Sequence, residues 1–131
     1  MYSVQIKNVN KTYQVSEEVS FTALDQINLD IKKGEFIAIV GPSGSGKSTL
    51  MNILGLLDRP TTGTYFLDGK NVSQLSDITL AEIRNKKIGF VFQNFNLLKR
   101  TTSIENVSLP LIYSKVGRKE RIQRATKALN A

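Results

Sequence analysis

The residues best suited to chemistry lie between Gly41 and Ser48, in the run Gly-Pro-Ser-Gly-Ser-Gly-Lys-Ser. The run fits the spacing G-x-x-x-x-G-K-S/T, with an apolar stretch on each side. Its glycines let backbone N–H groups curl around an anion, and the N-terminus of a following helix adds positive potential. The Lys47 ammonium can contact outer phosphates, and the Ser48 hydroxyl can bind Mg²⁺. The motif predicts a phosphate site, and a glycine-rich turn that matches by chance is the alternative.

The composition restricts the other chemistry that the chain can do. The 131 residues are enough for one modest domain with a core, and 40% of them are apolar. The sequence has no cysteine and no histidine, so disulfides, thiolate metal sites and a histidine general base are excluded. No signal-like region begins the chain and no long apolar run follows, so we expect a protein of the cytosol.

The positive charge is concentrated near the C-terminal end. Of the net charge of +7, the segment 115–127 contributes six basic residues against one acid. Such a run is typical of the solvated face of a helix, which we favour over a nucleic-acid or membrane patch. No aromatic residues alternate with these charges, so no nucleic-acid partner is expected.

The first half of the chain has strand-like patterns around the glycine-rich run. Segments 2–13 and 19–31 are predicted to be strands of an antiparallel, half-solvated sheet, because their apolar residues tend to alternate with polar ones. The apolar run 36–40 predicts a buried strand that leads into the loop. Segment 47–57 predicts a largely buried helix, and 64–67 a short strand that ends in an Asp68-Gly69 turn.

The second half is predicted to be mainly helical. Ser76 is suited to cap a helix that runs to about residue 85, and 87–92 predicts another buried strand before a loop. Ser103 is expected to cap a helix kinked at Pro110. After Gly117, a basic helix over 119–131 is predicted to turn three apolar residues inward, namely Ile122, Ala125 and Leu129.

The chain resembles the ATP-binding subunit of an ABC transporter. The segments that carry the resemblance are NILGLLDRPTTGTYFLDG, IRNKKIGFVFQNFNLL and SIENVSLPL, and the likeness covers essentially the whole chain. It is greatest to the subfamily for lipoprotein release, macrolide efflux and antimicrobial-peptide export. The resemblance implies an α/β fold, a P-loop NTPase core with an antiparallel β subdomain. The implied parts are a β subdomain (1–31 and 64–72), a P-loop core (32–63 and 73–93) and the start of a helical subdomain (94–131).

The resemblance also assigns roles to single residues. Tyr13 would stack on adenine, although an ordinary tyrosine at a strand end is the alternative. Lys47 and Gln93 would act in catalysis, and Ser48 and Gln93 would bind Mg²⁺; for Gln93, a loop glutamine without a role is the alternative. The phosphates of ATP or ADP would bind to nine consecutive residues: Gly41, Pro42, Ser43, Gly44, Ser45, Gly46, Lys47, Ser48 and Thr49.

The implied parent protein hydrolyses ATP to drive transport by a partner membrane permease of the export or lipoprotein-release type. It would act as a homodimer of ATP-binding subunits, peripheral on the cytoplasmic face of the cell membrane. The signature motif, the Walker B strand and its catalytic glutamate, and the switch histidine of similar proteins are absent from this sequence. We therefore expect an N-terminal fragment that binds nucleotide with little hydrolysis. Another P-loop NTPase or kinase is the alternative, although Asn85-Lys86-Lys87-Ile88 departs from the guanine motif NKxD.

Overall fold

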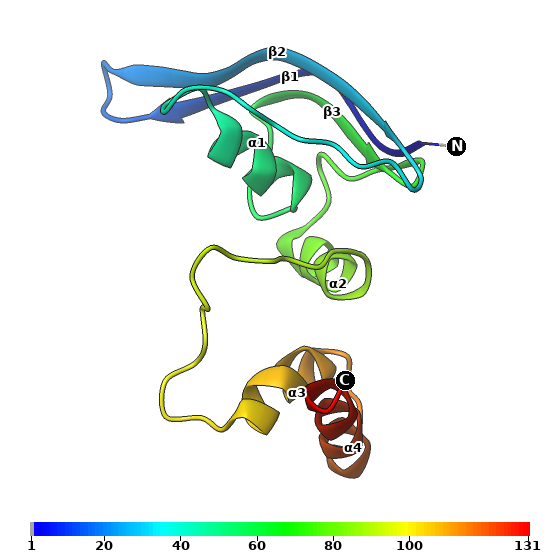
Figure 1. The fold of residues 1–131 in the computed structure, drawn as a ribbon. Coiled ribbons are helices and arrows are strands. Elements are labelled where there is room, and N and C mark those ends of the chain that lie inside the picture. Colours follow the sequence, from blue (N-terminus) through cyan, green and yellow to red (C-terminus); the bar gives the residue numbers. More distant parts are fainter. Residues whose placement is uncertain (1) are drawn as a thin grey trace. The chain divides into compact units, whose positions relative to one another are not determined.

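The computed structural model describes residues 2–131, which form four strands and four helices (Figure 1). In chain order the elements are β1 (Tyr2–Gln14), β2 (Ser20–Lys32), α1 (Lys47–Leu54), β3 (Thr62–Leu67), β4 (Lys70–Asn71), α2 (Asp77–Lys87), α3 (Ser103–Tyr113) and α4 (Arg118–Leu129). The chain divides into two compact units, residues 1–84 and 85–131. Among the described residues, no helix combines the length and the apolar character needed to cross a membrane.

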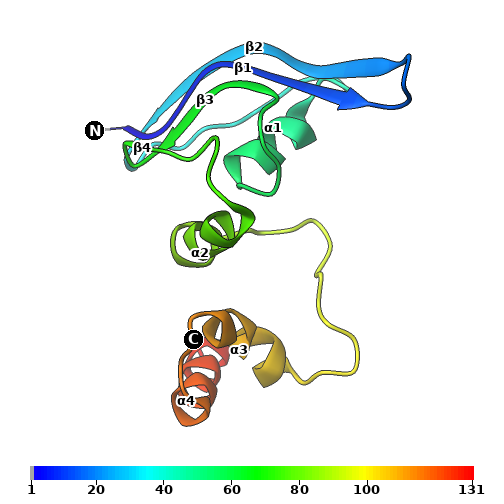
Figure 2. The ribbon, with the colours of Figure 1, turned by 180° about the vertical axis from the view of Figure 1, so that it is seen from behind.

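The first unit contains one antiparallel sheet with the strand order β2-β1-β3-β4 (Figure 2). The register pairs Ile6 with both Leu29 and Tyr65, so one face of the sheet gathers apolar side chains. Ile6, Val9 and Tyr65 are fully buried there. The predicted antiparallel β subdomain is therefore confirmed, and it joins segments that lie far apart in the sequence.

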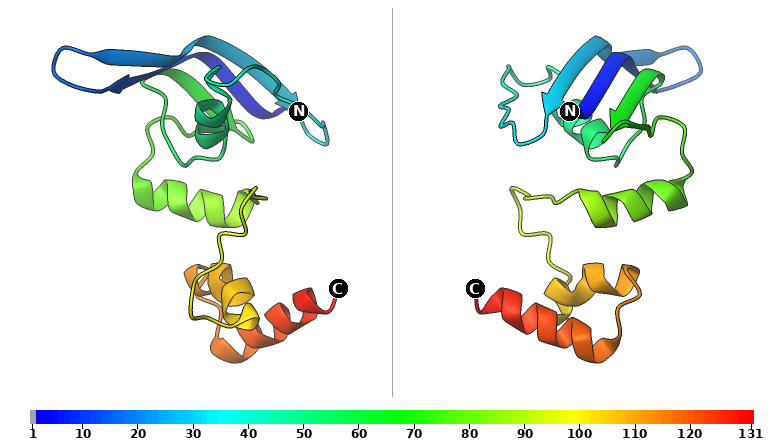
Figure 3. Two further views of the ribbon diagram at one scale, coloured as in Figure 1. Left: turned by 60° about the vertical axis from the view of Figure 1, so that its left-hand side comes forward. Right: turned by 90° about the vertical axis from the view of Figure 1, so that its right-hand side faces the viewer.

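Helix α1 lies along one face of this sheet (Figure 3). Its residue Ile53 is fully buried, and Leu56 just beyond the helix is also in the core. The helix is shorter than predicted and is not buried on most sides, since Met51 is 52% exposed. Within this unit the sheet packs against one side of the helix only, so residues on the opposite side, such as Met51, stay exposed.

The two apolar runs predicted to be buried strands are not strands in the structure. Residues 36–40 and 88–92 belong to no sheet. Phe36 is 94% exposed and Val91 is fully exposed. A strand exists through its hydrogen bonds to a neighbour, and neither run has a neighbouring strand among residues 2–131. Apolar content alone therefore did not make these runs strands.

The caps of α2 and α3 are formed by hydroxyl side chains. Ser76 Oγ accepts a hydrogen bond from the Thr79 N–H at 3.3 Å, which confirms the predicted cap of α2. The cap of α3 is Thr102, one residue before the predicted Ser103. Thr102 Oγ1 accepts from the Glu105 N–H, and the Glu105 carboxylate accepts from the Thr102 N–H, so the pair forms a capping box. This reciprocal pair satisfies two backbone donors, whereas Ser103 would satisfy one.

In the second unit, α3 and α4 pack against each other. Helix α4 begins at Arg118, with Gly117 at its N-cap. Of the three residues expected to face inward, only Ala125 is buried, whereas Ile122 and Leu129 are exposed. A single partner helix covers too narrow a stripe of α4 to bury all three.

Candidate phosphate-binding site

The glycine-rich loop is held against strand β2. Gly46 has φ +84° and is the N-cap of α1, and its carbonyl accepts the Leu50 N–H at 2.9 Å. A Cβ atom on Gly46 would lie 2.5 Å from the Ala23 carbonyl oxygen and 3.0 Å from Leu24 Cδ2. Only glycine permits both this backbone conformation and this approach to the strand. The loop is thus positioned by the sheet as well as by the helix.

Strand β2 is irregular where the loop approaches it. Lys11 pairs with Leu24, but its neighbour Thr12 pairs with Thr22, so Ala23 is skipped in the register. Such a bulge changes the direction of the strand locally. It lies at the place where the Ala23 carbonyl meets Gly46, and both features belong to one contact between strand and loop.

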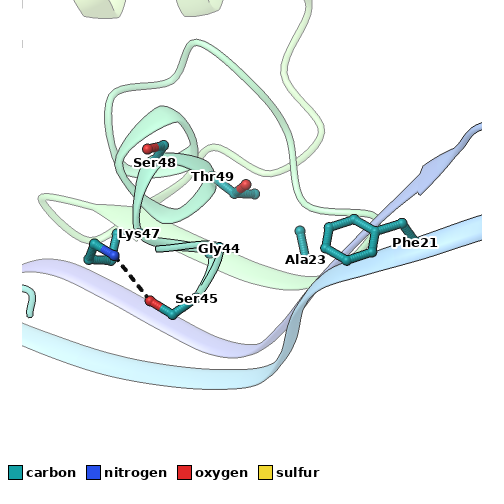
Figure 4. A pocket seen from close by; sticks show the side chains of 8 residues that line it. Phe21, Ala23, Gly44, Ser45, Lys47, Ser48 and Thr49 are labelled. Carbon is teal, nitrogen blue, oxygen red and sulfur yellow. Dashed lines mark hydrogen bonds between the residues drawn. The ribbon is translucent and has the colours of Figure 1, made fainter. Parts of the chain in front are cut away.

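The Lys47 ammonium bends back over the loop. It donates to the Pro42 carbonyl oxygen at 2.5 Å. It also donates to Ser45 Oγ at 3.2 Å, the bond drawn as a dashed line in Figure 4. An ammonium has three N–H donors, so a third acceptor such as a phosphate oxygen can be accommodated beside these two. The positive charge is therefore concentrated where the loop turns into the helix.

A pocket of about 220 Å³ opens beside the loop. Its lining consists of residues 44–49 from the loop and α1, with Phe21 and Ala23 from β2 (Figure 4). The volume is below the roughly 300–1,000 Å³ typical of small-molecule sites. The pocket is thus smaller than a site that encloses a whole drug-sized molecule.

The pocket contains some predicted site residues and omits others. Lys47, Ser48 and Thr49 line it together with the loop residues 44–46, whereas residues 41–43 do not. Phe21 was not predicted as a site residue. Its register opposite Tyr13 in the predicted antiparallel pair was the signal that could have identified it.

Two neighbouring side chains, Asp58 and Lys11, contact Tyr13. Its hydroxyl donates to Asp58 Oδ2 at 2.8 Å, and Lys11 Nζ lies 4.7 Å from the centroid of its ring. Gln93 is exposed and lies in an irregular segment of the second unit. The roles expected for Tyr13 and Gln93 remain predictions.

A metal ion would find few protein ligands here. Within residues 2–131, no three Asp, Glu, His or Cys side chains lie close enough together to hold one. Ser48 supplies one neutral hydroxyl at the start of α1. Since Mg²⁺ usually binds through few protein oxygens together with water and substrate phosphates, Ser48 fits such a site as one ligand.

The spacing G-x-x-x-x-G-K-S in a loop that leads into the N-terminus of α1 beside a sheet is typical of a phosphate-loop protein. The sequence profile of the ABC transporter family matches residues 24–131, and the chain belongs to that family. The predicted family is confirmed, and the match separates the chain from other phosphate-loop enzymes.

The chain is similar to several ATP-binding proteins of this family. It is 56% identical over 126 residues to the ABC transporter ATP-binding protein YknY of Bacillus subtilis, which covers 96% of this chain and 54% of YknY. It is 60% identical over 111 residues to the macrolide export ATP-binding/permease protein MacB of Chlorobaculum tepidum, covering 85% of this chain and 17% of MacB. The chain thus spans about half the length of YknY and a smaller part of MacB.

A solved structure has the same fold. It is the dimeric, post-hydrolysis state of the ATP-binding cassette MJ0796 bound to ADP and Pi. The corresponding protein belongs to Methanocaldococcus jannaschii. The sequence identity is 50% and the TM-score 0.86, and the match covers 97% of this chain and 56% of that chain. The predicted ABC ATPase fold is therefore confirmed for the matched region.

Proposed function

We propose that the chain binds ATP and ADP through residues 41–49 and forms the nucleotide-binding part of an ABC transporter ATPase. The observation that carries the proposal is the fold of the GPSGSGKS run: a loop seated on β2, followed directly by α1, with the Lys47 ammonium over it. The 50% identical cassette MJ0796, solved with ADP and Pi, supports the choice of ligand.

Each residue of the site has a proposed task. Backbone N–H groups of the loop and of the first turn of α1 bind phosphate oxygens, and Lys47 places its charge on the outer phosphates. Tyr13 stacks on the base, because a flat ring contacts either face of a purine without a buried polar group. Ser48 and Gln93 would hold Mg²⁺, and the ion would supply positive charge to neutralise the phosphates. Gln93 also orients the attacking water.

The proposed activity of the whole protein is hydrolysis of ATP to drive transport by a membrane permease. In that reaction water attacks the γ-phosphorus in line while the bond to the bridging β-phosphate oxygen breaks, which gives ADP and inorganic phosphate. Lys47 stabilises the charge that spreads over the γ-phosphoryl oxygens. The proposed partners are a permease of the export or lipoprotein-release type and a second ATP-binding subunit. The combined ATP-binding/permease name of MacB and the dimeric cassette MJ0796 support these partners. Such a protein works at the cytoplasmic face of the membrane.

The proposed division of the chain follows the same family pattern. Residues 1–31 and 64–72 form the β subdomain, and 32–63 with 73–93 contribute to the P-loop core. Residues 94–131 begin the helical subdomain. The alternative for the chain taken by itself is a nucleotide-binding segment without turnover.

Calorimetric titration with ATP and ADP tests the proposal. Charge-assisted hydrogen bonds are worth about 1.5–3 kcal/mol, so Lys47→Ala should weaken binding by roughly tenfold or more. Lys70→Ala, which removes an exposed lysine on β4, is the matched control and should bind normally. Equal affinity of a folded Lys47→Ala variant and the unchanged chain would contradict the proposal.

A further inference from the structure

Three groups converge on the carboxylate of Asp58. Oδ1 accepts from Lys11 Nζ at 2.6 Å and from the Arg59 backbone N–H at 2.7 Å, and Oδ2 accepts from the Tyr13 hydroxyl at 2.8 Å. The Asp58 side chain is 29% exposed and that of Lys11 is 13% exposed. Because the pair is largely screened from water, its hydrogen bonds hold the groups in place more firmly than an exposed ion pair would.

Two hydrogen bonds hold the Lys11 ammonium over one face of the Tyr13 ring. The ammonium donates to the Arg59 carbonyl oxygen at 2.9 Å as well as to Asp58. It lies over the ring, 4.7 Å from the centroid, within the range of a cation–π interaction. An aromatic ring has two faces, and a cation fixed over one of them leaves the other for stacking.

Asp58 also connects the ring to the phosphate loop. Helix α1, which begins at Lys47, ends at Leu54, and Asp58 follows in the turn after it. Tyr13 pairs across the sheet with Phe21, which lines the pocket beside the loop. The carboxylate therefore links the helix that carries the phosphate site to the strand that carries the aromatic ring.

We propose that Asp58 is a positioning residue for the base of the bound nucleotide: it holds the Tyr13 ring by its hydroxyl and keeps Lys11 on one ring face. The base then stacks on the other face, at a set distance from the phosphate loop. This inference rests on the proposed nucleotide function and deepens it. Tyr13→Phe tests it, because this variant retains the ring but loses the hydrogen bond to Asp58.

The test compares ATP with inorganic tripolyphosphate, which lacks the base. Asp58→Asn replaces one acceptor oxygen by an NH2 donor, so the side chain no longer presents a separate oxygen to each of Lys11 and Tyr13. In calorimetric titrations, Asp58→Asn and Tyr13→Phe should each bind ATP roughly three- to tenfold more weakly. Tripolyphosphate should bind both variants as it binds the unchanged chain. Asp30→Asn, which removes a carboxylate elsewhere on the same sheet, is the control.

The double variant separates positioning from a general effect on the fold. If Tyr13 and Asp58 act through one hydrogen bond, adding Tyr13→Phe to Asp58→Asn should weaken ATP binding less than the product of the two single effects. Should Asp58→Asn not fold, Tyr13→Phe alone still breaks the bond from its other end.

Two results would overturn the inference: ATP affinities of Asp58→Asn and Tyr13→Phe equal to that of the unchanged chain, or equal losses for ATP and tripolyphosphate. If the unchanged chain bound neither ligand, or bound ATP but not tripolyphosphate, the proposed phosphate site itself would be contradicted. The two failures are thus distinguishable.

Discussion

The hydroxyl of Tyr65 on β3 donates a hydrogen bond to the carbonyl oxygen of Leu54, the last residue of α1, at 2.8 Å. The final carbonyls of a helix have no partner within the helix, so this bond satisfies one of them and anchors the helix to the sheet. Burial, together with the charge of Asp68, raises the pKa of Tyr65 to about 12, so the hydroxyl keeps its proton at neutral pH.

Tyr65→Phe should therefore destabilise the chain although the ring is retained. The change removes one largely buried hydrogen bond and leaves the Leu54 carbonyl without that donor, at a cost of about 1 kcal/mol. Thermal unfolding followed by circular dichroism measures the effect. Tyr113→Phe, at a tyrosine that is 71% exposed, is the control and should unfold at the original temperature. Identical unfolding of both variants would show that the bond contributes nothing.

Gly46→Ala should abolish nucleotide binding. The new Cβ would lie 2.5 Å from the Ala23 carbonyl oxygen, and alanine would have to adopt φ +84°. The loop must therefore move away from β2. Gly44→Ala is the matched control, because its φ is +80° but open space surrounds the new atom. Titration with ADP should show a larger loss for Gly46→Ala than for Gly44→Ala. Equal losses would mean that backbone strain, rather than contact with the strand, is decisive.

The stability that Asp58 provides should depend on pH. Burial raises the pKa of Asp58, but hydrogen bonds from Lys11, Tyr13 and Arg59 outweigh it, and the net pKa lies below the usual value. A carboxyl with a lowered folded pKa stabilises the fold fully above its unfolded pKa of about 3.9, and the contribution disappears as the pH falls through the folded pKa. Urea unfolding should show Asp58→Asn to be less stable at about pH 6, with the difference shrinking below about pH 4. A difference independent of pH would contradict the carboxylate's role.

The chain by itself should bind ATP with negligible turnover. The catalytic glutamate, the signature motif and the switch histidine that the family resemblance assigns to hydrolysis are absent from this sequence. The exposed apolar runs 36–40 and 88–92 have backbone groups without strand partners and should favour self-association. Phosphate release and light scattering measure both properties. Rapid release from a monomer, abolished by Lys47→Ala, would show that this chain carries a complete catalytic site.

Local patterns were enough to predict much of this fold. Alternation of apolar and polar residues predicted the antiparallel strands β1 and β2, because one face of a sheet must be buried. The spacing of the run from Gly41 to Ser48 predicted the loop at the start of α1, since its glycines and its lysine act within eight consecutive residues. These features depend on residues close together in the sequence.

Tertiary structure decided what depends on distant partners. The apolar runs 36–40 and 88–92 are not strands, because strand formation requires a neighbour that no local pattern supplies. Asp58 meets Lys11 and Tyr13 only after the turn that follows α1 returns to β1, and no spacing indicates that contact. Likewise, Phe21 lines the pocket together with Ala23, the residue at which β2 bulges and meets the loop. The sequence alone determined the phosphate loop, whereas the folded sheet determined which side chains surround it.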